Sequence, residues 1–201
     1  GLPMRMGFPQ DRYSLPLAVG VCLLAAALVD GLFKDLPRKA FALAVLLALA
    51  GGLHFNLALQ YRQDWNDLRD FFWQLTWRAP GVTPNTLFLF DRLPFRYYED
   101  DSLSAPLNWV YAPEFQGRQM PYLLYDLTVR NNSFKAMSGQ PVTRDFRATF
   151  FEGSSSQALV VDYQAVGCLH VLNPRYDAEH YQLSYRLQVA LPLSEPERLI
   201  L

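Results

Sequence analysis

Apolar and polar positions divide the chain into two long apolar runs and a mixed remainder. The first run has no charged residue from 13 to 29, and the second is uncharged from 40 to 61 apart from His54. Each is about long enough to cross a hydrocarbon core of roughly 30 Å, and neither has the polar stripe of a surface helix in a soluble domain. The pattern predicts two transmembrane helices, about 13–33 and 40–61, that form a helical hairpin. Two core helices of a soluble protein are the alternative interpretation.

The loop between the two runs is basic. It holds Lys34, Arg38 and Lys39 against Asp35. Cytoplasmic loops of membrane proteins carry an excess of Lys and Arg. We therefore expect this loop on the cytoplasmic side and residues 62–201 outside the cytoplasm. The sequence thus predicts a multi-pass protein of the plasma membrane, with membrane lipid as a partner.

After residue 61 the apolar positions narrow to one helical stripe. They recur at intervals of three and four residues, which is the spacing of one face of a helix. The stripe comprises Leu57, Tyr61, Trp65, Leu68, Phe72 and Leu75. We expect an amphipathic helix over 62–80 that continues the second span and ends near Pro80. Asp64, Asp67 and Asp70 are either a row of catalytic carboxylates or a solvated face, and the pattern favours the solvated face.

Residues 81–201 alternate short apolar runs with polar turns, which is typical of a small α+β or α/β domain. The predicted elements are a strand at 86–91, helices at 105–111, 119–129 and 179–190, and β-rich runs at 145–152, 157–164 and 168–172. Polar turns separate the three β-rich runs and predict an antiparallel β meander. The predicted fold class is therefore a membrane α-helical hairpin followed by an extracytoplasmic α+β (or α/β) domain.

Charge and motifs limit the chemistry. A formal net charge of -1 and an isoelectric point near 6.3 argue against nucleic acid as a partner. No dinucleotide-binding, hydrolase or zinc-protease motif occurs, so we predict no cofactor and no catalytic residue within this sequence.

A metal site is the weaker hypothesis, because the metal-capable side chains match no familiar zinc spacing. These side chains are Cys168, His170, Asp177 and His180. Asn131 begins a glycosylation sequon.

The segment Arg12-Tyr13-Ser14-Leu15-Pro16 resembles the opening of a late transmembrane helix in polytopic GT-C type glycosyltransferases, the dolichyl-phosphate-mannose protein mannosyltransferase-like group. The next span, the helix over 62–80 and the tail also resemble the C-terminal end of large bacterial membrane proteins of that kind. The resemblance implies a parent that transfers a hexose from a lipid-linked phosphosugar donor, with its catalytic part upstream of this chain. It carries over only Arg12 and Tyr13, as neighbours of the lipid phosphate.

Two functions follow for the outer domain. In a glycosyltransferase parent it recognises the acceptor or supports the structure. In the alternative, the chain is part of a non-enzymatic membrane protein whose outer domain binds a partner or ligand. The sequence leaves both open.

Overall fold

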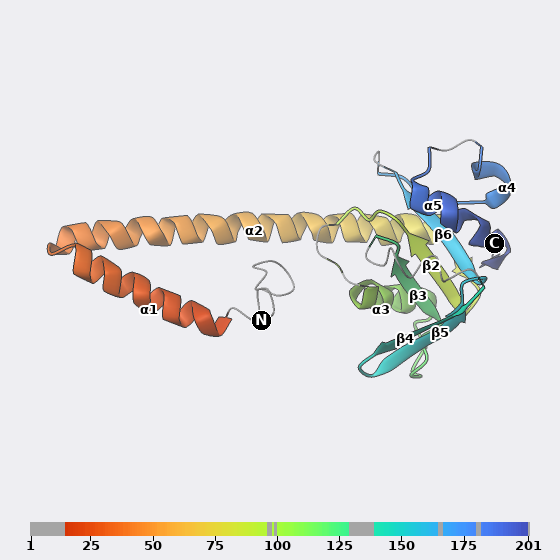
Figure 1. Ribbon diagram of the computed structural model, residues 1–201, viewed down its shortest axis with the longest axis horizontal. Helices are drawn as coiled ribbons and strands as arrows, with labels where there is room; N and C mark the ends of the chain where they lie inside the picture. The colour runs from red at the N-terminus through yellow and green to blue at the C-terminus, as the bar shows by residue number, and fades with distance from the viewer. Residues whose placement is uncertain are drawn as a thin grey trace. The chain divides into compact units, whose positions relative to one another are not determined.

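The computed structural model describes residues 15–95, 98, 100–128, 139–164, 167–179 and 182–200. Arg12, Tyr13, the sequon at Asn131 and His180 lie outside the described residues. The chain forms two compact units, Gly1–Asp64 and Trp65–Leu201 (Figure 1).

The first unit contains α1 (Leu15–Leu32) and the greater part of α2 (Leu36–Arg78). Of the described helices, α2 is the one that is long and apolar enough to cross a membrane, and its most apolar window is not buried within the protein. α1 is apolar but shorter. By length and composition the described part of the chain therefore has one candidate membrane helix, at the second predicted span. A second crossing stays a prediction.

α2 continues without a break to Arg78, and its last turns belong to the second unit. There the side chains of Phe71 and Leu75 are fully buried, and Leu68 and Phe72 pack partly against the same core. Three members of the predicted stripe thus pack as expected, because a three- and four-residue spacing puts them on one helix face. The tryptophan of that stripe, Trp65, is exposed instead.

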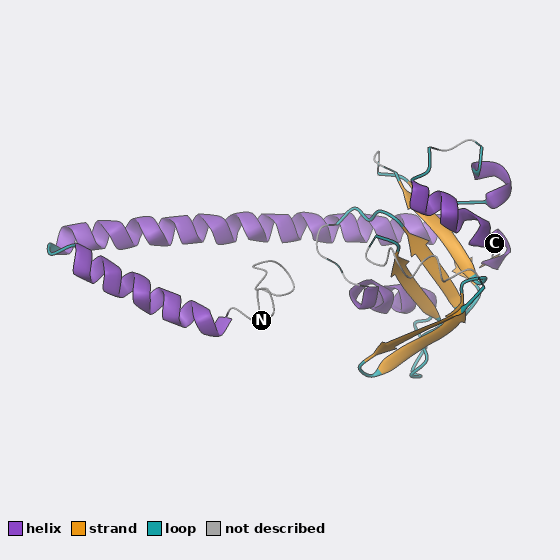
Figure 2. Cartoon of the chain, viewed as in Figure 1, coloured by secondary structure: helices purple, strands orange, loops and turns teal. Residues whose placement is uncertain are grey.

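A four-stranded sheet in the order β3-β2-β6-β7 is the centre of the second unit. Its strands are β2 (Thr86–Phe90), β3 (Tyr122–Asp126), β6 (Ala158–Tyr163) and β7 (Leu169–Val171). β2 is parallel to both of its neighbours, whereas β6 and β7 are antiparallel. Figure 2 shows the strands of this unit in orange and its helices in purple. Every residue of β2 and β3 is buried, as expected for parallel strands that are covered on both faces.

Two layers cover the sheet. On one face, α3 (Asp100–Tyr111) and the last turns of α2 pack on Phe88, Phe90, Leu159 and Val161. On the other face, α5 (Tyr185–Ala190) and the hairpin of β4 (Pro141–Phe146) and β5 (Thr149–Ser154) pack on Leu87, Leu89 and Val160. The second unit is thus a mixed α+β domain with its core on both faces of one sheet. The remaining elements are β1 (Gly81–Val82), which pairs with β8 (Leu199–Ile200), α4 (Pro174–Asp177), and two 3-10 turns at Leu191–Leu193 and Pro196–Arg198.

The predicted antiparallel meander is wrong as a single three-stranded unit. Its last two runs do form the antiparallel β6–β7 pair. The run at 145–152, however, contains the end of β4, a tight turn and the start of β5, and this hairpin is a separate two-stranded sheet. β6 pairs instead with β2, about seventy residues earlier in the chain. Local turn signals identify hairpins, but they do not identify such a distant parallel partner.

The helix predicted at 119–129 is also wrong, because this segment contains the strand β3. Its apolar residues occur at three- and four-residue intervals, yet the strand is buried on both faces and needs apolar residues at nearly every position. The strand predicted at 86–91 is confirmed as β2. The helix predicted at 105–111 begins earlier, at Asp100, and the helix predicted at 179–190 begins later, at Tyr185. Ser184 sets that later start, because its hydroxyl accepts the backbone N–H of Leu187 as an N-cap.

Candidate functional site

The strand order creates a position at which ligands commonly bind. The chain leaves β2 for β3 on one side and later returns to pair β6 on the other side. In open sheets of parallel strands, such a reversal leaves a crevice outside the carboxyl ends of the two strands that flank it. Here those strands are β2 and β6.

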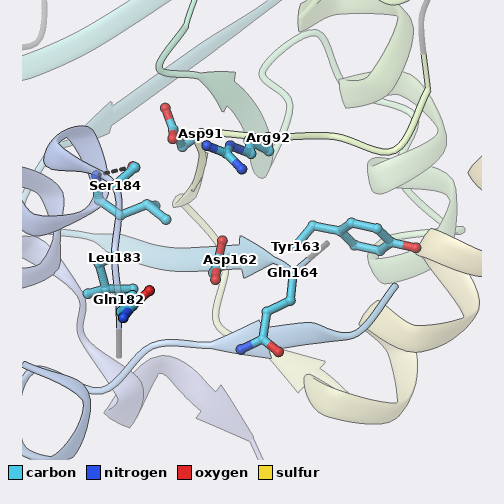
Figure 3. Close-up of a pocket in the computed structure, with 9 residues that line it drawn as sticks. Asp91, Arg92, Asp162, Tyr163, Gln164, Gln182, Leu183 and Ser184 are labelled. Carbon is cyan, nitrogen blue, oxygen red and sulfur yellow. Dashed lines mark hydrogen bonds between the residues drawn. The ribbon is translucent and has the colours of Figure 1, made fainter. Parts of the chain in front are cut away.

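A cleft of about 370 Å³ lies at this position. It is lined by Asp91, Arg92, Asp162, Tyr163, Gln164, Gln182, Leu183, Ser184 and Leu187. Asp91 and Arg92 directly follow β2, and Asp162 and Tyr163 end β6. In Figure 3 the Asp162 carboxylate lies in the middle of the lining, with Leu183 and Gln182 on one side and Tyr163 on the other. We refer to these nine residues as the cleft.

Asp91 anchors one wall of the cleft. Its side chain is 2% exposed, and its Oδ1 lies 3.2 Å from Nη1 of Arg186 on α5. A carboxylate that has lost its water needs such a partner, because an unpaired buried charge is costly. The ion pair therefore neutralises Asp91 and joins α5 to the end of β2.

Asp162 is the carboxyl group in the middle of the cleft, and it is half-buried. Burial raises the pKa of Asp162 above its ordinary value; the cation of Arg92 opposes this rise, the carboxylate of Asp91 adds to it, and His170 opposes it. The Asp162 carboxylate accepts no hydrogen bond from another described residue. Its oxygens are therefore open to a ligand.

The last turns of α2 hold the turn between β6 and β7. Gln74 Nε2 donates to the carbonyl of Gly167 at 2.7 Å, and Gln74 Oε1 accepts the N–H of Leu169 at 2.8 Å. Within the turn, the N–H of Gly167 donates to the carbonyl of Gln164 at 2.8 Å. Gly167 has a φ of +79°, which favours glycine. One side chain of α2 thus fixes the turn that carries Gln164 into the cleft.

The candidate metal ligands do not converge. His170 Nε2 lies 3.2 Å from Asp177 Oδ1, but Cys168 is an exposed free thiol, and His180 lies outside the described residues. Within the described part of the chain, no three His, Cys, Asp or Glu side chains come together in a way that would hold a metal ion. A zinc site needs three or four ligands. The described residues therefore offer the pair of His170 and Asp177 and no third ligand.

The row Asp64, Asp67 and Asp70 is absent from the cleft lining. Asp70 is exposed and lies 3.6 Å from the guanidinium of its neighbour Arg69. Burial raises the pKa of the Tyr163 phenol, and the carboxylates of Asp67 and Asp70 raise it further, so both charges act on the cleft from outside. Asp67 and Asp70 thus act electrostatically on Tyr163, and none of the three carboxylates of the row lines the cleft.

The cleft residues themselves were missed by sequence reasoning. The available signal was a carboxylate directly after an apolar strand, as in Phe90-Asp91 and Val161-Asp162. This signal gains meaning only when the two strands are known to be parallel neighbours. No family model, no curated protein and no solved structure matches the chain. The cleft and the candidate membrane helix are therefore the features that bear on its function.

Proposed function

We propose that residues 65–201 form a ligand-recognition domain of a membrane-anchored protein, and that the cleft binds a small, uncharged ligand rich in hydroxyl groups. The observation that carries this proposal is the cleft at the reversal point between β2 and β6, with Asp162 open in its middle. Crevices of this kind are the usual ligand sites of parallel sheets.

The charges of the cleft favour an uncharged ligand. Asp91 is neutralised by Arg186, and the remaining charged pair, Arg92 and Asp162, has opposite signs. A phosphate or a nucleotide would call for a surplus of donors and positive charge. The cleft instead mixes donors and acceptors, because Gln164 and Gln182 supply amides of both kinds. Vicinal hydroxyl groups, as in a saccharide, are donors and acceptors at once and suit such a lining.

The membrane context belongs to the same proposal. α2 is the candidate span, and we propose that α1 provides a second crossing in the plasma membrane and that residues 62–201 face away from the cytoplasm. The charges of Lys34, Arg38 and Lys39 in the connecting loop support this direction. Labelling of Ser156→Cys in a Cys168→Ser background tests it, since Ser156 is exposed. Reaction with a membrane-impermeant reagent in intact cells is expected, and reaction only after lysis would invert the topology.

The resemblance at residues 12–16 extends the proposal to a parent protein. In a glycosyltransferase that uses a lipid-linked phosphosugar, the cleft would hold the saccharide acceptor, while Arg12 and Tyr13 would lie near the lipid phosphate. In a non-enzymatic parent the same cleft would bind a ligand for recognition alone. Saccharide binding is expected in both cases, and transfer activity of the whole parent separates them.

A binding screen tests the proposed function. The full chain in lipid nanodiscs is titrated calorimetrically with neutral methyl glycosides, a uronic acid, an amino sugar and inorganic phosphate. We expect a neutral glycoside to bind, and we expect Asp162→Asn to weaken it about tenfold or more, since a hydrogen bond to a charged group contributes about 1.5–3 kcal/mol.

The matched control is Asp145→Asn, because Asp145 is exposed on the β4–β5 hairpin and does not line the cleft. This variant should bind like the unmodified chain. The proposal is refuted if no compound of the panel binds, or if Asp145→Asn and Asp162→Asn weaken binding equally.

A further inference from the structure

One pair of side chains beside the cleft has no role in the proposed function: His170 on β7 and Asp177 on α4. β6 and β7 are antiparallel, and their register sets His170 directly opposite Asp162. Side chains of directly opposed residues project from the same face, with Cβ atoms about 4.5–5.5 Å apart. The imidazole of His170 is therefore the immediate neighbour of the carboxyl group in the middle of the cleft.

Asp177 holds this imidazole in place. Its Oδ1 lies 3.2 Å from His170 Nε2, while its Oδ2 accepts the backbone N–H of Asn173 at 2.6 Å. Asp177 is only 7% exposed, so it cannot easily turn towards water. A buried carboxylate that is fixed by the backbone and bonded to one imidazole nitrogen is a common way to orient a histidine. The order in space is Asp162, then His170, then Asp177.

The other charged groups around Asp162 do not compete for this role. Asp91 is held by Arg186 of α5, and Arg92 contributes a cation from the end of β2. Asp162 thus faces Asp91 and Arg92 from the end of β2 and His170 from β7. Asp177 of α4 binds His170, and Arg186 of α5 binds Asp91. Among these groups, Asp162 is the carboxyl that combines a place in the cleft lining with oxygens that are not hydrogen-bonded to a described residue.

We propose that Asp162 exchanges a proton with a hydroxyl group of the bound ligand, and that His170, held by Asp177, is its positioning residue. This inference rests on the proposed function for the presence of a hydroxyl ligand. In the forward step the ligand O–H bond breaks, the proton joins an Asp162 oxygen, and the electron pair stays on the ligand oxygen. The reverse step returns the proton. The ligand oxygen becomes a better nucleophile in the forward step, which is the role of a general base.

Burial and His170 act in opposite directions on the pKa of Asp162. Burial raises the pKa of Asp162, which brings the carboxyl closer to the pH at which proton transfer in both directions is efficient. The neighbouring imidazole acts in the opposite direction on the same pKa and so favours the carboxylate that accepts a proton. Because Asp177 fixes the orientation of the imidazole, His170 stays beside Asp162 and continues to act on its pKa.

The test is a titration of Asp162 without any ligand, so it is independent of the binding screen. The full chain in lipid nanodiscs is labelled with carbon-13 at the aspartate carboxyl carbons, and Asp162→Asn assigns the Asp162 signal. We expect Asp162 to titrate above an ordinary aspartate. His170→Gln should raise its pKa further by about half a unit or more, because a neighbouring cation is lost. Asp177→Asn should shift it in the same direction, since the imidazole is released.

A merely structural role of Asp177 gives a different result. In that case Asp177→Asn lowers the unfolding temperature but leaves the Asp162 titration unchanged, which overturns the positioning role. An Asp162 that titrates at or below the ordinary value, or that ignores His170→Gln, overturns the proposal as a whole. Asp145→Asn is again the control and should leave the Asp162 titration unchanged. A chain that binds no glycoside but shows the expected titrations refutes the proposed ligand and, with it, proton exchange with that ligand, while the positioning of His170 beside Asp162 by Asp177 stands.

Discussion

Gln74 is a specific point at which the connection between α2 and the cleft can be broken. Replacing it by alanine removes both the donor to Gly167 and the acceptor for Leu169. The side chain is partly buried, and the backbone groups that it satisfies lie at the β6–β7 turn. The substitution therefore acts on a turn more than ninety positions later in the sequence, while the helix itself should persist because alanine is a good helix former.

The expected magnitude follows from the two hydrogen bonds. Each contributes about 0.5–1.5 kcal/mol net, so their loss destabilises the closed turn by about 1–3 kcal/mol. This corresponds to a roughly 5- to 150-fold increase in the population of the opened turn. The effect is concentrated at the Leu169 amide, whose hydrogen is held by Gln74 Oε1.

Hydrogen exchange at single-residue resolution measures this effect. In Gln74→Ala we expect the Leu169 amide to exchange about fivefold faster or more, while amides at the centre of β2 keep their rates. Gln116→Ala is the control, since Gln116 is exposed in the loop after α3. An unchanged Leu169 exchange rate in Gln74→Ala would show that the turn is held by other contacts and would refute the reasoning.

The further predictions concern stability and the titration of buried groups. Asn108 is buried and bridges α3 to β3 by donating to the carbonyl of Tyr122 at 2.7 Å and accepting its N–H at 3.1 Å, so Asn108→Ala should cost about 2–4 kcal/mol in denaturant unfolding. The Tyr111 hydroxyl donates to the carbonyl of Ala79 at 2.8 Å, so Tyr111→Phe should lower the free energy of unfolding by about 1 kcal/mol. Burial also raises the pKa of Tyr111. In an ultraviolet titration its phenol should therefore stay neutral at a pH where exposed tyrosines ionise. Burial also raises the pKa of Asp162, so the folded state binds its proton more tightly than the unfolded state, and stability should fall as pH rises from the ordinary aspartate pKa through the folded one. Unfolding of Asp162→Asn should lack this component of the pH dependence.

Sequence patterns identified elements that are determined locally. The uncharged run before residue 61 and the stripe at Leu68, Phe72 and Leu75 correctly indicated one long helix with a packed end, because helical periodicity depends only on near neighbours. The strand β2 was likewise predicted from its apolar run and the turns that bound it. These features needed no knowledge of distant contacts.

The cleft depends on contacts that the sequence does not display. Its two central carboxylates, Asp91 and Asp162, are neighbours only because β2 and β6 pair in parallel across about seventy residues. The ion pair of Asp91 with Arg186 likewise joins residues 95 positions apart. β3 was mistaken for a helix because burial on both faces removes the alternation by which strands are identified. The site was therefore missed for the same reason as the topology.

The burial of Phe71 and Leu75 determines where the protein can be truncated without exposing its core. A truncation that begins at residue 81, after the helix, would remove two fully buried side chains and uncover Phe90 and Phe95, whose rings contact Phe71. It would also remove Gln74 and so release the β6–β7 turn. Such a fragment is expected to aggregate on expression. A fragment that begins near Trp65 keeps the whole core and is the appropriate starting point for producing the domain without its apolar helices.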